Sequence, residues 1–278
     1  MIAENLRRRL AMCVDSAQEH IIDSVLLIHN PEKRTRIGAV LWNLSNDHIN
    51  LGIYAYFVDG KPGALKQHLS LASLLAFAST HEDGGQTLSH WDLPLYAMLS
   101  DNPRVIDLVA HLEPDDYLKN RDNPRLPQFV VHMLQLALRG EHDALQAKIE
   151  RGAKGSGKQL REEFRTGQDF FSLLLRQDQD ALEALILQEA QWWETIRKKG
   201  KETGLPLFED LFAANSLLHA KLCWLKGIPV RVDHPLVPKD LLPVNPLPHY
   251  DDVYDFLLPG WVTPKRGLWG KVSRWLAR

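Results

Sequence analysis

The chain is poor in cysteine and in long apolar runs. Cys13 and Cys223 are the only cysteines among 278 residues, and they form no CxxC spacing. This usage points to a reducing compartment, so we expect a cytoplasmic protein without disulfides. The most apolar windows, such as residues 69–78, are about ten residues long, whereas a bilayer span needs roughly 20. The N-terminus also lacks the apolar core of a signal peptide. We therefore expect no membrane-spanning helix.

An excess of charge of one sign is also missing: 33 Lys and Arg residues face 35 Asp and Glu residues, which gives a net charge of −2. The charge is unevenly distributed, because the residues after Asp255 carry five basic side chains and no acidic one. Residues 1–255 therefore sum to −7. An acidic body repels nucleic acid and attracts basic proteins. We expect no nucleic acid as a partner, and the charge allows a protein partner with a basic surface.

Apolar residues recur at helical spacing up to Gly227, and no early segment alternates as a strand does. The fold class that this pattern predicts is all-α. The first helix has an apolar stripe that runs from Ile2 to Ile21. The other expected helices cover residues 35–58, 64–80, 88–99, 103–112, 127–139, 142–151, 158–176, 179–199 and 207–226.

Four polar turns between these helices recur at similar intervals. They lie within residues 58–65, 99–106, 138–145 and 175–182, and matching positions are 41, 39 and 37 residues apart. A unit of this length fits one helix, a turn and a second helix, so we expect a repeat-like array of antiparallel helical hairpins. An ordinary up-and-down helical bundle remains the alternative.

After Gly227 the composition changes. Six prolines between Pro235 and Pro259 exclude a continuous helix and predict an extended segment packed on the helices. Beyond it, Leu268 to Leu276 has the apolar spacing of a short basic amphipathic helix with two tryptophans. We thus expect a helical-hairpin domain at 1–227, an extended Pro-rich segment at 228–264 and a short basic amphipathic helix at 265–278.

Motifs for catalysis or cofactor binding are not found. Residues 152–158 have the GxxxxGK spacing of a phosphate-binding loop, but Gln159 replaces the required Ser or Thr and a helix precedes the loop. His219 and Cys223 lie at i and i+4, a spacing that two metal ligands can use, but two ligands do not make a metal site. Packing of both side chains in the core explains the pair better. No GxSxG sequence occurs. We expect no catalytic residue, no cofactor and no metal.

Two acidic clusters interleaved with tyrosine are candidate partner-binding surfaces. Tyr adds rigid contact area and Asp adds charge that suits a Lys- and Arg-rich protein, although most surface carboxylates are merely solvated. Adjacent aromatics at 170–171 and 192–193 can each place one ring at the edge of the core as a partner anchor, although packing of both rings between helix layers is the favoured alternative. The residues of the two clusters are Glu113, Asp115 and Asp116 in the first and Tyr250, Asp251, Asp252, Tyr254 and Asp255 in the second.

The C-terminal third carries a resemblance to a known family. Lys-Gly-Ile-Pro-Val at 226–230 is followed by Asp-His-Pro-Leu-Val-Pro-Lys-Asp-Leu-Leu at 233–242 and Tyr-Asp-Asp-Val-Tyr-Asp-Phe-Leu at 250–257. Upstream, Leu-Trp-Asn at 41–43 precedes the turn at Asp59 and Gly60. Over most of residues 35–257 the chain resembles the immunity protein 49 family of bacterial polymorphic toxin systems.

The resemblance implies a protein without catalysis that is made beside a toxin, binds it directly and silences it. It implies no particular functional residue. The acidic body adds a hypothesis: the toxin acts in the cytosol, as a nuclease does, and its basic face is occupied by carboxylates that mimic phosphate. Two other interpretations stay open, a helical-repeat scaffold that joins proteins and a peripheral membrane protein anchored by residues 268–276.

Overall fold

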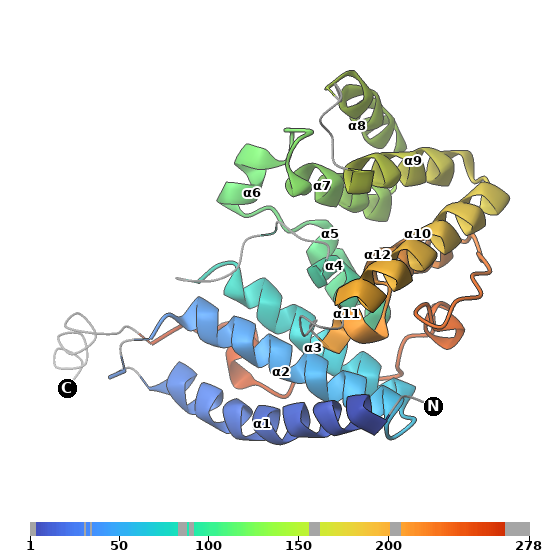
Figure 1. Ribbon diagram of the computed structural model, residues 1–278. Helices are drawn as coiled ribbons and strands as arrows, with labels where there is room; N and C mark the ends of the chain where they lie inside the picture. The colour runs from blue at the N-terminus through green and yellow to red at the C-terminus, as the bar shows by residue number, and fades with distance from the viewer. Residues whose placement is uncertain are drawn as a thin grey trace. The chain divides into compact units, whose positions relative to one another are not determined.

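A computed structural model describes residues 4–30, 32–33, 35–82, 88, 92–155, 162–200 and 207–264. These residues form twelve α-helices and two short 3-10 helices, and they contain no strand, which confirms the predicted all-α class (Figure 1). None of the helices in this part of the chain is long and apolar enough to cross a membrane. The α-helices are α1 (Glu4–His29), α2 (Ile37–Phe57), α3 (Pro62–Ser79), α4 (Asp92–Ser100), α5 (Pro103–Ala110), α6 (Asp115–Asn120), α7 (Pro127–Arg139), α8 (His142–Gly155), α9 (Glu162–Arg176), α10 (Gln179–Gly200), α11 (Leu207–Leu211) and α12 (Ala214–Leu225), and the 3-10 helices are η1 (Lys239–Leu241) and η2 (Asp255–Leu257).

The chain divides into two compact units. The first combines Met1–Gln86 with Leu247–Arg278, and the second is Thr87–Pro246. These boundaries follow contacts in space, whereas the expected division at 227 and 264 followed composition along the sequence. That division into segments 1–227, 228–264 and 265–278 stays a prediction.

In the first unit α2 lies between α1 and α3 and packs against both. Twelve of its residues are buried, so this helix is apolar on almost every side. Gly52 permits the close approach to α3, because a Cβ atom there would lie 3.0 Å from the His68 Cβ. The core also takes in Tyr254 and Phe256 from the C-terminal segment. Residues far apart in sequence thus complete this core.

The loop between α2 and α3 follows the turn chemistry of its sequence. Gly60 has a φ of +66°, a left-handed conformation that glycine adopts without steric cost. Pro62 then opens α3, where its missing N–H costs no hydrogen bond. The turn predicted at Asp59 and Gly60 is therefore where α2 gives way to α3.

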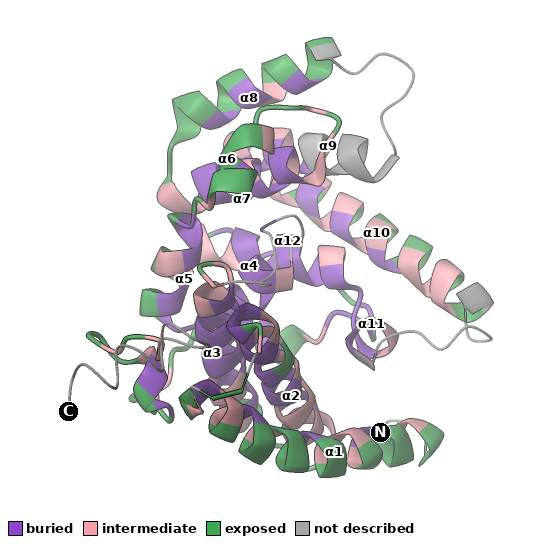
Figure 2. Ribbon diagram, turned by 90° about the vertical axis from the view of Figure 1, so that its left-hand side faces the viewer, coloured by how far each residue is buried: buried purple, intermediate pink, exposed green. Residues whose placement is uncertain are grey.

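The second unit is a set of packed helices whose last member returns to its first. Contacts run along the chain from α4 to α5, α7, α8, α9, α10 and α12, and α12 also packs against α4. A linear repeat array has contacts between neighbouring repeats only. The repeat-like hairpin array is therefore not confirmed. Buried residues concentrate in α4, α7 and α12 (Figure 2).

Two local predictions differ from the structure. The single helix expected at 207–226 is broken into α11 and α12. At the break, the Ala213 N–H donates a 2.9 Å hydrogen bond to the Leu236 carbonyl, so a contact distant in sequence replaces the helical one. The six-residue α6 was not predicted, because one and a half turns leave no apolar period to detect.

Residues 226–264 contain no α-helix, only η1, η2 and an isolated bridge between His234 and Val237. Lys221 of α12 binds part of this segment, since its Nζ donates to the carbonyls of Leu241, Leu242 and Pro243 at 2.9, 3.2 and 3.0 Å. The buried ammonium group of Lys221 thus supplies hydrogen-bond donors to backbone carbonyls that no helix or strand pairs.

Candidate partner-binding surfaces

The first acidic surface lies in the second unit, around α6. Asp115 and Asp116 are exposed and lie in the first turn of this helix, where the helix dipole stabilises a negative charge. Glu113 is exposed just before it. All three residues singled out in the sequence are thus exposed at the start of α6.

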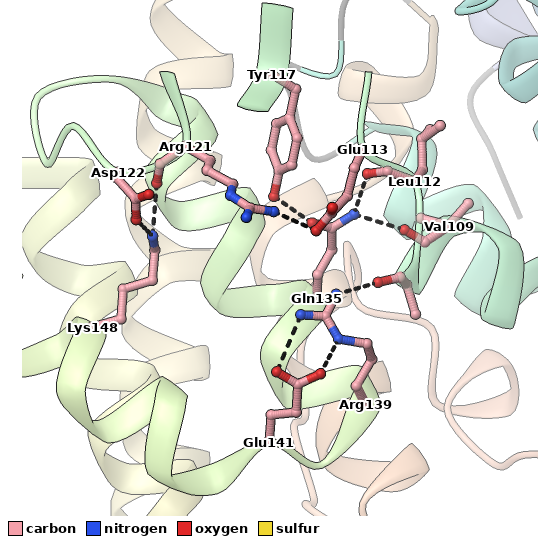
Figure 3. Close-up of polar contacts among 11 residues, drawn as sticks. Val109, Leu112, Glu113, Tyr117, Arg121, Asp122, Gln135, Arg139, Glu141 and Lys148 are labelled. Carbon is pink, nitrogen blue, oxygen red and sulfur yellow. Dashed lines mark hydrogen bonds and ion pairs between the residues drawn. The ribbon is translucent and has the colours of Figure 1, made fainter. Parts of the chain in front are cut away.

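A buried hydrogen-bond network fixes α6 against α5 and α7 (Figure 3). The Tyr117 side chain is buried, and its hydroxyl donates to Oε1 of Gln135 on α7. Gln135 Nε2 in turn donates to the carbonyls of Val109 and Leu112 at 2.9 and 2.8 Å. Burial raises the pKa of Tyr117, so the hydroxyl stays protonated and can donate. The acidic turn therefore rests on a satisfied polar core rather than on a loose loop.

Nearby cations modify the charge of this surface. Arg121 forms an ion pair with Glu113, so much of the Glu113 charge is compensated within the unit (Figure 3). Lys119 and Arg125 are exposed on the same stretch of chain. The carboxylates that this surface offers to a basic partner are therefore those of Asp115 and Asp116.

Lys148 of α8 braces the chain that follows α6. Its buried Nζ donates to the Arg121 carbonyl at 2.7 Å and to Asp122 Oδ1 at 3.1 Å, and it lies 4.3 Å from the centroid of the Phe129 ring. Burial raises the pKa of Asp122 while the Lys148 hydrogen bond lowers it, and the lowering prevails. Burial, together with the positive charges of Lys148 and Arg121, lowers the pKa of His132 to about 4. These groups hold the surface in shape and do not extend it.

The second acidic surface lies in the first unit, on the part of the chain that follows the second unit in sequence. Asp251 is bound through its backbone: its N–H donates to Gln67 Oε1 at 3.1 Å, and Gln67 Nε2 donates to its carbonyl at 3.0 Å. The carboxylates of Asp251 and Asp252 are exposed. Tyr250 accepts a hydrogen bond from the Leu247 N–H at 3.1 Å. The main chain is thus fixed while these carboxylates face solvent.

Tyr254 is the one member of this cluster that is buried. Its hydroxyl lies 2.7 Å from His48 Nε2, and His48 Nδ1 lies 3.0 Å from His68 Nδ1. Its ring stacks on Phe256 with centroids 4.9 Å apart. Burial raises the pKa of Tyr254 to about 12. Tyr254 therefore anchors the segment, and the surface consists of Tyr250, Asp251, Asp252 and Asp255.

Asp255 is exposed but paired. Both of its carboxylate oxygens lie 3.1 Å from His29 Nε2 at the end of α1. The His29 hydrogen bond lowers the pKa of Asp255. The hydrogen bond of His29 to the Val25 carbonyl, followed by the one to Asp255, raises the pKa of His29. The His29–Asp255 pair thus links the C-terminal segment to the end of α1.

The two pairs of adjacent aromatic residues differ in burial. Phe170 and Phe171 are both buried, so neither ring reaches the surface. Trp193 is partly buried and its Nε1 donates to the Glu209 carbonyl at 3.1 Å, whereas Trp192 is exposed. The tryptophan pair follows the division between core and edge, whereas the phenylalanine pair follows the alternative in which both rings are packed.

His219 and Cys223 lie in the core, as expected from their helical spacing. The His219 ring stacks on Phe170 with centroids 3.8 Å apart, and its Nδ1 lies 2.9 Å from Glu189 Oε2. Burial raises the pKa of Cys223 to about 12, which keeps the thiol protonated. The GxxxxGK sequence continues from α8 into residues 156–158, which lie outside the described residues, as does the basic segment 265–278.

The two acidic surfaces belong to different compact units, so each is a separate candidate. The comparison with family models gives a match to the model described as immunity protein 49 over residues 60–241, about two thirds of the chain. The matched range includes Glu113, Asp115 and Asp116 and ends before Tyr250. Neither the comparison with curated proteins nor the comparison with solved structures finds a match.

Proposed function

The chain belongs to the immunity protein 49 family, and on this premise we propose that it binds one cognate bacterial toxin and blocks it by direct occlusion. Membership of the family implies toxin neutralisation, and the match over residues 60–241 is the observation that carries the proposal. In this role the protein acts by binding alone, in the cytoplasm of the producing cell, without a cofactor and without nucleic acid.

The acidic surface around α6 is our first choice for the contact. It lies within the residues that match the family, and the Tyr117–Gln135 bond holds it in one conformation before a partner arrives. A preformed surface loses less conformational entropy on binding than a flexible one. The second surface, at 250–255, is the alternative contact.

The charge of the chain suits a toxin with a basic working face, such as a nuclease. Residues 1–255 sum to −7, and carboxylates aimed at a phosphate-binding face can take the place of the substrate's phosphates. Asp115 and Asp116 supply two such carboxylates at the edge of α6. The contribution of charge would appear as a binding affinity that falls with added salt.

Copurification from the producing bacterium tests the proposal. The chain carries an affinity tag at its N-terminus, is expressed in the native cell and is recovered at physiological salt, which keeps contacts between charged groups. Mass spectrometry should find one near-stoichiometric partner with a C-terminal toxin domain. Several housekeeping proteins, or no partner from cells that make the toxin, would contradict the proposal and favour a scaffold.

A further inference from the structure

One face of α1 exposes large apolar side chains. Leu10 and Ile28 are buried, whereas Met12, Ile22 and Leu26 are 63%, 63% and 62% exposed. At 100° per residue, Leu26 points about 160° away from Leu10 and Ile28. Figure 2 shows exposed residues along the length of this helix. We call the surface of Met12, Asp15, Glu19, Ile22, Asp23 and Leu26 the outer face of α1.

The outer face is acidic as well as apolar. Asp15, Glu19 and Asp23 are exposed between and beside the three apolar residues and lie at spacings of three or four, on neighbouring turns. A surface of this kind fits a segment that offers apolar side chains flanked by positive charge.

We propose that the outer face of α1 binds residues 265–278 of the same chain, the terminal segment. This segment contains five basic residues, no acidic residue and the apolar residues Leu268, Trp269, Val272, Trp275 and Leu276. It therefore supplies both properties that the outer face requires. The proposal goes beyond toxin binding and does not depend on it.

The chain reaches the outer face from the correct end. Trp261 packs edge-on against His29, the last residue of α1, with ring centroids 6.4 Å apart. Thr263 donates a hydrogen bond to Glu82, in the same unit. The terminal segment therefore starts four residues after a side chain, that of Trp261, which is already placed against the end of α1.

The lengths agree. Leu26 and Met12 are 14 residues apart on α1, which corresponds to about 21 Å at 1.5 Å per residue. The terminal segment is also 14 residues long, so in helical form it would extend about 21 Å. Running antiparallel to α1, it would cover the outer face from Leu26 to Met12.

Charge argues against a second copy of α1 as the occupant. Asp15 and Glu19 lie near the middle of the outer face, so two such faces brought together about a two-fold axis would place four carboxylates at their centre. Like charges placed opposite one another in an interface cost binding energy. A basic segment meets no such penalty at Asp15 and Glu19.

A carbodiimide, which joins an amine to a carboxylate in direct contact, tests the proposal on the full natural chain. We expect mass spectrometry to find Lys271 joined to Asp15, Glu19 or Asp23. A mixture of ¹⁴N- and ¹⁵N-labelled protein separates links within one chain from links between two. Links only between chains would overturn the proposal in favour of a second copy.

Matched variants test the apolar half of the contact. Ile22→Ser with Leu26→Ser keeps every carboxylate, and we expect the Lys271 link yield to fall about fivefold or more because the burial of two aliphatic side chains is lost. Trp269→Ser with Trp275→Ser changes only the terminal segment and should give the same loss, even if the α1 variant folds poorly. Leu118→Ser, an exposed leucine of the other unit, should leave the yield unchanged.

Vesicles of phosphatidylethanolamine and phosphatidylglycerol provide the competing outcome. If the terminal segment serves as a membrane anchor, the natural chain sediments with these vesicles and shows no link to the three carboxylates of α1. That result overturns the proposal. Links within the chain, together with no sedimentation, support it.

Discussion

Lys221 Nζ and Asp101 Oδ1 lie 2.6 Å apart, and both side chains are completely buried. Lys221 comes from α12 and Asp101 from the turn that follows α4, where Asp101 has a left-handed φ of +56°. The other Asp101 oxygen accepts a 3.2 Å hydrogen bond from the Asn245 N–H. One ion pair thus joins two helices of the second unit to the segment that leads out of it.

Removal of one partner of this pair should be costly. In Lys221→Met the Asp101 carboxylate stays buried without its cation, and breaking a buried pair in this way typically costs about 3–5 kcal/mol. The free energy of unfolding in urea measures the loss. The double variant Lys221→Met with Asp101→Asn should recover part of it, because no buried charge remains. A single variant within about 1 kcal/mol of the natural chain would show that the pair is not a stabilising element.

The Tyr117–Gln135 bond should stabilise the second unit. Tyr117→Phe leaves Gln135 Oε1 in the core without its donor, and an unsatisfied buried acceptor costs about 1–3 kcal/mol. Gln135→Met should cost more, because it also leaves the carbonyls of Val109 and Leu112 without a donor. Urea denaturation of both variants checks this order. The reverse order would mean that the Gln135 contacts to the carbonyls are weak.

The buried His48 should make stability fall in acid. Burial, with a smaller contribution from His68, lowers the pKa of His48 to about 3, against 6.5 for an unburied histidine. Between these values the unfolded chain binds a proton that the folded chain does not, so acidification favours unfolding. For one such group the loss between pH 7 and pH 5 is about 2 kcal/mol. His48→Gln should remove it, as measured by urea denaturation at both pH values.

Asp47, the neighbour of His48, should act with the opposite sign. Burial raises its pKa to about 6, so the folded chain keeps a proton that the unfolded chain releases between pH 3.8 and pH 6. Its contribution to stability is therefore present in acid and is lost as the pH rises through about 6. Asp47→Asn should make the natural acid sensitivity steeper, because Asp47 then no longer offsets the contribution of His48. Equal pH profiles for Asp47→Asn and the natural chain would contradict the assigned burial of Asp47.

Charge reversal separates the two candidate surfaces once the toxin partner is in hand. If the surface around α6 makes the contact, Asp115→Lys with Asp116→Lys should weaken binding at least tenfold, or about 1.4 kcal/mol. Reversal at Asp251, Asp252 and Asp255 tests the second surface in the same way, and the two variants serve as controls for each other. Isothermal titration calorimetry measures both. Unchanged affinity eliminates the surface that was altered.

The helical class was predictable because its signal is local. Most helices keep an apolar period over ten or more residues, so their approximate ranges follow from the sequence. The exceptions arise from contacts distant in sequence. The hydrogen bond from the Ala213 N–H to the Leu236 carbonyl lies at the break after α11, and no local sequence pattern predicts it.

The same distinction applies to the candidate surfaces. Their carboxylates were identified by charge alone, but the sequence could not show that Arg121 would pair with Glu113. Nor could it show that Tyr254 would reach His48, 206 residues earlier in the chain. The signal that could have located α6 is Gln135, a polar residue within the apolar helix predicted at 127–139. A buried amide requires hydrogen-bond partners, and Tyr117 on a helix is one of them.

Direct neutralisation is the central claim, and growth measures it most directly. The toxin domain recovered by copurification is induced in a susceptible bacterium with this chain, with its Asp115→Lys and Asp116→Lys variant, or with an empty vector. The account predicts normal growth with the natural chain, together with a one-to-one complex of the purified proteins. Arrest of growth despite abundant natural chain, or protection without any complex, would contradict it.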